Sequence, residues 1–330
     1  MRPAQHRTAR VKIDFTCNIC GNSNRLPGES FEREKASCSG CGSNVRTRGL
    51  VQALSLELFG VSLAITDFPR VKSLRGIGLS DSRQYADRLA GKFDYRNTYY
   101  AREPRLDIMN PPPDEFGKYD FLLASEVFEH VPPPVEVAFQ NAFRLLKPDG
   151  FLLLTVPYSL GDSIIEHYPG LNQFGLVRVG DRMLLVNCSP AGDVQVFDNL
   201  VFHFGGSGAA LEVREFSEAG LKEALRGAGF SNVHICSADY PPFGVVRPES
   251  WSLPVVARKA PFGFSQEAAR DMLAQWAALR KSFRELGGEF WVRLGFKLGL
   301  IDRRRYFTAR GNRLEPSATD SYNDEEQTKQ

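Results

Sequence analysis

The chain has 330 residues, of which 42% are hydrophobic and 24% are charged. Its 41 basic and 39 acidic side chains leave a net charge of only +2, so the overall charge does not require a nucleic-acid partner. The composition excludes a low-complexity or disordered chain and leaves room for one α/β domain with a small appended module.

The N-terminal segment, Met1 to Lys12, is polar and basic and lacks an apolar core, so no secretory signal is expected. No run of 18 apolar residues occurs in the chain, which argues against a membrane-spanning helix. We therefore expect a cytoplasmic protein, in which paired cysteines favour metal binding over disulfides.

Two Cys-x2-Cys pairs follow, each with a glycine directly after it and with seventeen residues between the pairs: Cys17, Cys20, Cys38 and Cys41. Two thiolates on one turn can face one ion, and the glycine permits a positive φ that turns backbone N–H groups toward sulfur. Four thiolates make a closed tetrahedral site. The spacing therefore predicts a structural Zn²⁺ ion in a zinc-ribbon-like module over residues 1–48.

Two interpretations of this module remain open. It could only stabilise the fold, or it could recruit a substrate through the nearby Arg25, Arg46 and Arg48. The remaining cysteines, Cys188 and Cys236, are unpaired by spacing and are interpreted as buried small side chains.

Residues 49–260 alternate between short apolar runs and amphipathic segments, after a linking helix at 50–59. Strands are expected at 71–74, 93–100, 105–108, 119–124, 151–156, 233–237 and 255–257, and helices at 82–90, 135–146 and 217–228. This alternation predicts an α/β fold with a Rossmann-like, doubly wound, mostly parallel seven-stranded sheet.

Three segments depart from that alternation. Residues 158–215 are rich in glycine and aromatic residues and are interpreted as a β-rich insertion, or lid, over one end of the sheet. Residues 261–310 are expected to form a helical extension, with a helix at 265–284. The polar segment 311–330 is expected to be a disordered tail.

Polar and glycine residues follow several expected strands, and ligands of open α/β sheets bind at the carboxyl ends of the strands. Gly76, Gly78 and Ser80 follow the first strand, and Asp107 follows the third. Ser125-Glu126-Val127-Phe128-Glu129-His130-Val131 follows the fourth. Each has a structural alternative, such as a turn glycine, a capping carboxylate or a hydrogen-bonded histidine. Their joint position favours a ligand site.

Residues 119–131 (YDFLLASEVFEHV) and 145–157 (LLKPDGFLLLTVP) resemble the fourth and fifth strand region of class I methyltransferases that use S-adenosylmethionine (SAM). The resemblance is closest to the branch of ubiquinone and menaquinone methyltransferases. It is specific over 119–157 and looser over 71–260, and it covers neither the cysteine module nor the C-terminal segment.

The resemblance implies that SAM lies across the ends of the first four strands. Gly76 and Gly78, with Ser80 at the family's third glycine, would lie beside its amino-acid part, and Ser125 and Glu126 beside its methionine side. Asp107 and Ile108 would lie at the adenine, and Asn97 or Asp94 at the ribose. The family's acidic residue before the glycines is Leu74 here, which leaves open a degenerate relative without activity.

The implied function is methyl transfer to a small-molecule or glycan acceptor, on oxygen or nitrogen. An acceptor hydroxyl must lose a proton, and His130 is the expected base because it follows the fourth strand and histidine titrates near neutral pH.

Other functions compete with this one. An RNA methyltransferase, or an RNA-binding zinc-ribbon protein with a degenerate domain, would also suit a four-cysteine module. The mixed apolar and basic segment 290–305 could contact an anionic membrane surface. A dehydrogenase is disfavoured because Asp81 occupies the sixth position of the Gly-x-Gly-x-x-Gly fingerprint.

Overall fold

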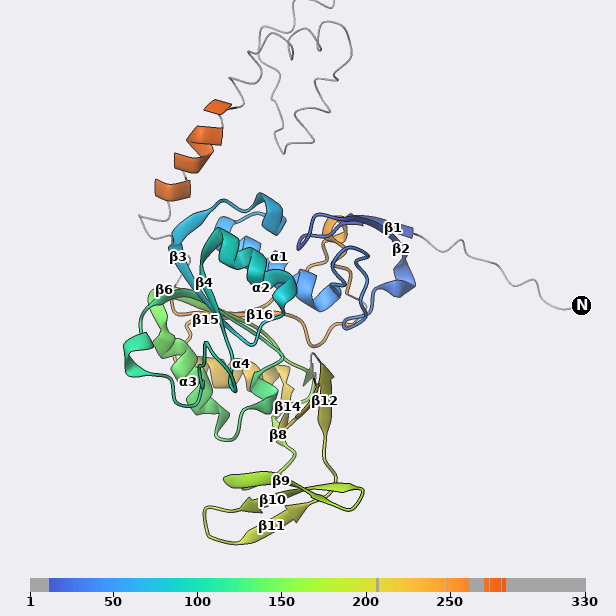
Figure 1. Ribbon diagram of the computed structural model, residues 1–330, viewed down its shortest axis with the longest axis vertical. Helices are drawn as coiled ribbons and strands as arrows, with labels where there is room; N and C mark the ends of the chain where they lie inside the picture. The colour runs from blue at the N-terminus through green and yellow to red at the C-terminus, as the bar shows by residue number, and fades with distance from the viewer. Residues whose placement is uncertain are drawn as a thin grey trace, which may run out of the picture. The chain divides into compact units, whose positions relative to one another are not determined.

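A computed structural model describes residues 12–205, 208–247, 249–260, 270–272, 274–279 and 281–282 (Figure 1). The chain divides into two units, Met1–Met272 and Leu273–Gln330. In the second unit, the described residues 274–279 and 281–282 are helical, as the sequence predicts for that part of the extension. The segment 290–305 and the tail 311–330 lie outside the described residues. Within the described ranges, no helix is long and apolar enough to cross a membrane.

A six-stranded sheet forms the centre of the first unit. Its strands are β3 (Val71–Leu79), β4 (Phe93–Thr98), β5 (Tyr119–Ser125), β6 (Leu146–Thr155), β15 (Asn232–Ile235) and β16 (Val255–Arg258). Their order is β15-β16-β6-β5-β3-β4. The four strands from β4 to β6 are parallel, whereas β16 runs antiparallel to both β6 and β15. The predicted Rossmann-like, mostly parallel α/β sheet is confirmed.

The prediction of a seventh strand at 105–108 is wrong. Tyr99 and Arg105 form only an isolated parallel bridge, with backbone hydrogen bonds from Tyr99 N to Pro104 O and from Leu106 N to Tyr99 O. The chain then turns at Asp107, whose carbonyl accepts from Asn110 N. The segment is therefore too short to continue the ladder.

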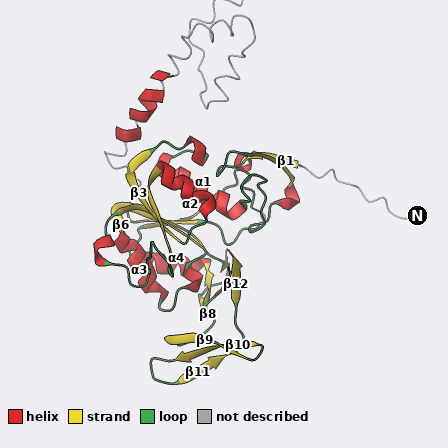
Figure 2. Cartoon of the chain, viewed as in Figure 1, coloured by secondary structure: helices red, strands yellow, loops and turns green. Residues whose placement is uncertain are grey.

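Helices cover both faces of this sheet (Figures 1 and 2). The α-helices are α1 (Val45–Phe59), α2 (Arg83–Lys92), α3 (Val135–Leu145) and α4 (Glu218–Gly227), and the 3-10 helices are η1 (Gly28–Ser30), η2 (Ile65–Asp67), η3 (Pro113–Glu115), η4 (Phe128–His130) and η5 (Pro241–Phe243). Side chains alternate along a strand. Accordingly, Phe121 and Leu123 of β5 join the core under α1 and α2, whereas Leu122 and Ala124 join the core under α3 and α4.

Two boundaries differ from the sequence prediction. Helix α1 begins at Val45 rather than residue 50, because Asn44 and Thr47 form a reciprocal capping box at its start. Strand β3 does not end at residue 74 but continues through both glycines to Leu79, paired with β4 and β5. The next helix, α2, is capped by Ser82, whose side chain accepts from Gln84 N.

The cysteine module shares its core with the sheet. Strands β1 (Lys12–Thr16) and β2 (Ser23–Pro27) form a hairpin, and Phe15, Cys17 and Ile19 pack in the same buried cluster as residues of α1 and β3. The expected boundary between residues 48 and 49 falls inside α1. The module and the sheet are therefore joined through one buried core that includes α1.

The insertion at 158–215 is β-rich, as expected. Its strands are β7 (Tyr158–Ser159), β8 (Ile165–Glu166), β9 (Gln173–Val179), β10 (Arg182–Cys188), β11 (Val194–Phe197), β12 (Phe202–Gly205), β13 (Gly208–Leu211) and β14 (Arg214–Ser217). Strands β9 to β11 form an outlying antiparallel sheet, and β14 pairs with β7 and β8 (Figure 1).

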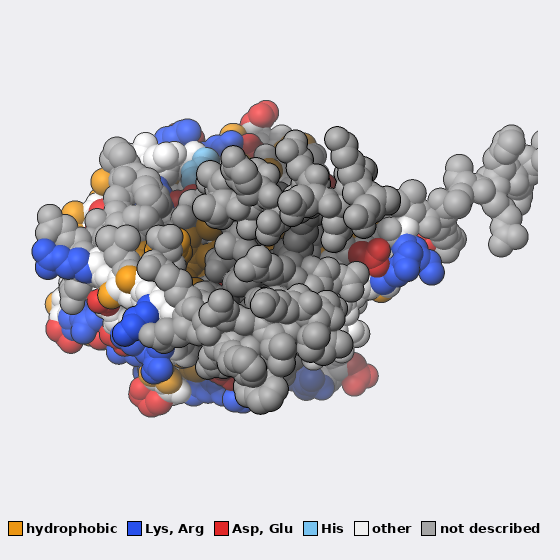
Figure 3. All heavy atoms as spheres, turned by 90° about the horizontal axis from the view of Figure 1, so that it is seen from above, with side chains coloured by type: hydrophobic (Ala, Val, Ile, Leu, Met, Phe, Trp, Pro, Cys, Tyr) orange, Lys and Arg blue, Asp and Glu red, His pale blue; other side chains and the backbone are white. Residues whose placement is uncertain are grey.

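Charged side chains of both signs lie interspersed around the visible face in Figure 3, in line with the small net charge.

Candidate functional site

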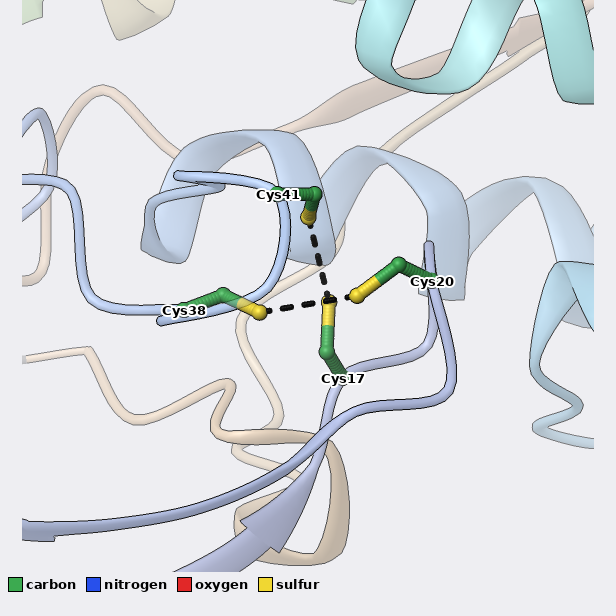
Figure 4. Close-up of side chains that lie close together, drawn as sticks. All are labelled: Cys17, Cys20, Cys38 and Cys41. Carbon is green, nitrogen blue, oxygen red and sulfur yellow. Dashed lines mark hydrogen bonds between the residues drawn. The ribbon is translucent and has the colours of Figure 1, made fainter.

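The four cysteines of the module converge on one point (Figure 4). The Sγ atoms of Cys17 and Cys41 are 3.7 Å apart and those of Cys20 and Cys38 are 3.6 Å apart, and all four lie within 4.8 Å of one another. Four thiolates about 2.3 Å from a tetrahedral zinc ion would be about 3.8 Å apart. The donor set and its spacing therefore fit the predicted Zn²⁺ ion.

The glycines after each cysteine pair have the backbone conformation that the sequence predicts. Gly21 has φ +80° and Gly42 has φ +70°, values that favour glycine. Their N–H groups donate to the carbonyls of Cys17 and Cys38 and close the two turns.

Of the three arginines considered for substrate recruitment, only Arg25 is exposed, in a surface pair with Asp14. Arg48 is completely buried and donates to Ser43 O and Gly244 O, both at 2.8 Å. It ties the module to the loop after β15 and is not available to a substrate. Arg46 points to the carboxyl edge of the sheet.

The carboxyl ends of β3 and β5 meet at that edge, since the two strands are parallel neighbours. The residue after each strand has left-handed backbone: φ is +55° at Ser80 and +57° at Glu126. Non-glycine residues seldom take this conformation, and where they do, functional sites are over-represented.

The two glycines of β3 are required by the protein's own packing. A Cβ at Gly76 would lie 2.2 Å from the Phe121 ring, and one at Gly78 would lie 2.1 Å from the Tyr95 hydroxyl. The sequence predicted that a ligand approaches these two glycines closely. In the structure, side chains from β4 and β5 lie against them. The turn that follows is formed by Ser80 to Ser82.

Asp81 lies in this turn and is almost fully buried. Its carboxylate accepts from the hydroxyl of Tyr85 at 2.6 Å and from the hydroxyl of Tyr95. Burial raises the pKa of Asp81 to about 6, although the two hydroxyls and the charge of Arg46 oppose the shift. A buried carboxylate that titrates near neutral pH is typical of functional sites.

The two residues considered for the ribose lie at opposite ends of β4. Asp94, near its start, is exposed and 3.1 Å from Arg75 Nε. Asn97 lies at the carboxyl edge, where its Oδ1 accepts from Asp81 N at 2.9 Å and its Nδ2 donates to Asp81 O at 2.8 Å. Only Asn97 is therefore near the site, and its amide holds the Asp81 turn in place.

Asp107 and Ile108 follow the isolated bridge next to β4. One oxygen of the Asp107 carboxylate accepts from Met109 N at 2.9 Å. Ile108 is buried, and its carbonyl accepts from Asn141 Nδ2 of α3 at 2.9 Å. The turn is thus fixed by α3.

Ser125 and Glu126 contact arginines of the cysteine module. Arg33 donates from Nη2 to Glu126 Oε1 at 2.8 Å, and Arg46 donates to Ser125 Oγ. Burial alone would raise the pKa of Glu126, but the charges of Arg33 and Arg46 outweigh it and hold the pKa below its ordinary value. Glu126 is therefore a buried, charged carboxylate.

His130 lies beside Glu129 and, from the insertion, His203. Its Nδ1 is 2.8 Å from Leu211 O, and its Nε2 is 3.6 Å from Glu129 Oε1. Glu129 is completely buried, and neither of its oxygens has a hydrogen-bond partner. The nitrogens and oxygen of the three residues lie within 4.8 Å of one another, so this cluster could also hold a cation.

Sequence reasoning gave no role at this edge to three residues: Arg33, Asp81, and Arg46 in its position beside Ser125. Asp81 could have been found, since it lies only two residues after the strand that carries the glycines. The arginines carried no such pattern, because their partner Glu126 lies 93 and 80 positions away in the sequence.

Residues 80–235, just under half of the chain, match a family described as "Methyltransferase domain". The comparison with curated proteins found no match. The matched residues begin at the turn after β3 and include β4, β5, β6 and the insertion.

Solved structures with a similar fold include the 1,6-didemethyltoxoflavin-N1-methyltransferase of Burkholderia thailandensis, at 16% identity and a TM-score of 0.35 over 64% of this chain and 78% of that one. An amino pentose methyltransferase of Micromonospora echinaspora is 12% identical, with a TM-score of 0.36 over 66% and 93% of the two chains. A sugar N-methyltransferase of Streptoalloteichus is 12% identical, with a TM-score of 0.38 over 67% and 90%.

The family match over residues 80–235 identifies the domain. Residues 80–235 form a methyltransferase domain, and the protein is a SAM-dependent methyltransferase.

Proposed function

We propose that SAM binds at the carboxyl edge of the sheet and that the protein methylates a small-molecule or glycan acceptor on oxygen or nitrogen. One observation carries this proposal: the adjacent parallel strands β3 and β5 are each followed directly by a non-glycine residue with left-handed backbone, Ser80 and Glu126. Such paired strand ends form the crevice in which open α/β sheets bind ligands.

The residues assigned to the cofactor follow from this position. Asp107 and Ile108 would face the adenine, Asn97 the ribose, and Ser125 and Glu126 the methionine side, with Gly76, Gly78 and Ser80 behind the amino-acid part. Bound SAM supplies an electrophilic methyl group, and orientation of the acceptor in line with it supplies much of the rate.

The acceptor would lie between η4 and the insertion. His130 stays our proposed base. The contact between its Nδ1 and Leu211 O favours the tautomer with the proton on Nδ1, which leaves Nε2 free to accept. Two other residues border the same space: Glu129, in the turn η4 after β5, and His203, in the insertion.

We also propose that the four-cysteine site holds Zn²⁺. Its role at this site is structural, since four thiolates leave no open coordination position. The resemblance to quinone methyltransferases, the RNA alternative and the contact of 290–305 with membranes stay predictions from the sequence.

The cofactor proposal is tested by calorimetric titration of zinc-loaded protein with S-adenosylhomocysteine, the product form of the cofactor. Asp107→Asn keeps an oxygen for Met109 N but removes the charge, so it preserves the turn. We expect it to weaken binding about tenfold, the size of a lost hydrogen bond to a charged group.

Asp94→Asn is the matched control, since Asp94 is exposed near the start of β4. It should bind as the unaltered protein does. Absence of binding to folded, unaltered protein would contradict the proposal. Incubation with SAM labelled in its methyl group, together with small molecules, glycans or RNA, then distinguishes the acceptor classes.

A further inference from the structure

The cysteine module supplies a bidentate partner to Glu126. Arg33 donates from Nη2 to Oε1 at 2.8 Å and from Nη1 to Oε2 at 3.3 Å, and the two side chains are only 14% and 12% exposed. Arg33 Nε donates at the same time to Ser252 O at 2.9 Å. A planar guanidinium held at three points fixes the carboxylate in orientation as well as in charge.

A second arginine of the module fixes the neighbouring hydroxyl. Arg46 donates from Nη1 to Ser125 Oγ, which also lies 2.9 Å from Thr155 Oγ1 of β6. The other side of Arg46 is held by Glu34, with Nε–Oε1 at 2.7 Å and Nη2–Oε2 at 2.9 Å. The hydroxyl of Ser125 is therefore oriented from two sides.

The cysteine cluster determines where these arginines lie. Arg33 is five residues before Cys38, and Arg46 is five residues after Cys41, in the first turn of α1. A backbone hydrogen bond of 3.2 Å from Arg46 N to Arg33 O joins the two segments. Gathering the four cysteines thus brings both guanidiniums to the edge of the sheet.

Glu126 needs this support for two reasons. Its backbone has φ +57°, a conformation that costs free energy unless its surroundings hold it. Its carboxylate is nearly buried, and a buried charge without a partner is strongly destabilising. Within the described residues, Arg33 and Arg46 are the arginines in ion pairs with it.

We propose that the four-cysteine module is a wall of the cofactor site, in which Arg33 and Arg46 act as positioning residues that orient Glu126 and Ser125 for SAM. The inference rests on the proposed cofactor site. The module would then neither only stabilise the fold nor recruit a substrate. It would have a third role, in which the affinity for the cofactor depends on the module.

The test is calorimetric titration of the zinc-loaded full chain with S-adenosylhomocysteine, with zinc content and melting temperature measured for every variant. Arg33→Met and Arg46→Met should each weaken binding about tenfold or more while one zinc per chain is retained. Arg33→Lys should restore part of the affinity, since it keeps the charge but loses the bidentate geometry. Arg182→Met is the matched control, because Arg182 forms an exposed pair with Asp198 in the outlying sheet.

A double-mutant cycle separates positioning from general stability. Arg33→Met combined with Glu126→Gln leaves no unpaired buried charge. The combined variant can therefore be measured even where Arg33→Met alone fails to fold. We expect the combined variant to bind no more weakly than Glu126→Gln alone.

The outcomes are distinguishable. If the unaltered protein does not bind S-adenosylhomocysteine, the proposed cofactor site itself fails. If the unaltered protein binds and Arg33→Met binds equally well, the positioning role is overturned. It is also overturned if the losses of binding free energy in Arg33→Met and Glu126→Gln add in the combined variant.

Discussion

The guanidinium of Arg33 lies 2.8 Å from the carboxylate of Glu126, although 93 residues separate them in the chain. Arg33 belongs to the cysteine module, and Glu126 follows the central strand β5. This contact joins the cysteine module, where we propose a zinc ion, to the edge where the methyltransferase domain is expected to hold its cofactor. Loss of the metal should therefore affect more than the module.

Removal of metal with a strong chelator is expected to lower the melting temperature and to reduce binding of S-adenosylhomocysteine. Cys17 and Cys38 pack in the same core as α1 and β3, so their release disturbs the sheet as well as the hairpin. Differential scanning calorimetry and metal analysis check this expectation.

Cys38→Ser should reproduce the effect of the chelator, whereas Cys188→Ser, a change in β10 away from the cluster, should leave zinc content unaltered. Full stability and ligand binding in metal-free protein would contradict this expectation and show that the metal is dispensable.

Asp81 is expected to make stability depend on pH. Its pKa is raised to about 6 in the folded state from 3.8, because burial disfavours the charged form. Well below pH 3.8 the group is neutral in both states and has no effect on stability. As the pH rises to about 6, the unfolded chain ionises first, and the folded state loses roughly 3 kcal/mol relative to it.

Asp81→Asn should remove this loss. Urea unfolding at several pH values is expected to show Asp81→Asn gaining stability relative to the unaltered protein between about pH 4 and 7. Asp87→Asn, on the exposed side of α2, serves as the control. Its free energy of unfolding should depend on pH in the same way as that of the unaltered protein. A constant difference between Asp81→Asn and the unaltered protein at all pH values would refute the shift.

Gly78→Ala is expected to destabilise the protein by about 1–3 kcal/mol or more, because overpacking a filled core forces its neighbours to move. The added Cβ would lie 2.1 Å from the Tyr95 hydroxyl and 2.3 Å from Asp81 Oδ2. Chemical denaturation measures the loss, and Tyr95→Phe in the same chain should recover part of it.

Gly91→Ala provides the contrast. Nothing lies within 4 Å of its added Cβ, and the residue is helical, so a gain of about 0.5–1 kcal/mol is expected. If Gly78→Ala were as stable as the unaltered protein, the crowding at β3 would not be real.

The sequence determined the features that depend on local pattern. The Cys-x2-Cys spacing with its glycines predicted the gathering of four thiolates, since two short turns suffice to present them. The apolar run of β5 and the capped helices that surround it predicted a parallel sheet, because burial on both faces demands continuous apolar strands. The positions of Ser125 and Glu126 at the sheet edge follow from the same pattern.

Tertiary structure decided what long-range packing controls. Strand β3 runs through Gly76 and Gly78 because β4 and β5 pair with it on both sides, so the glycines accommodate Tyr95 and Phe121 rather than form a loop. His203 reaches Glu129 because the insertion folds back against η4, where Val213 N also donates to Glu129 O. Arg33 and Arg46 reach Glu126 only because the cysteine cluster and α1 share a core with the sheet. Such ion pairs depend on distance in space, and sequence spacing does not encode that distance.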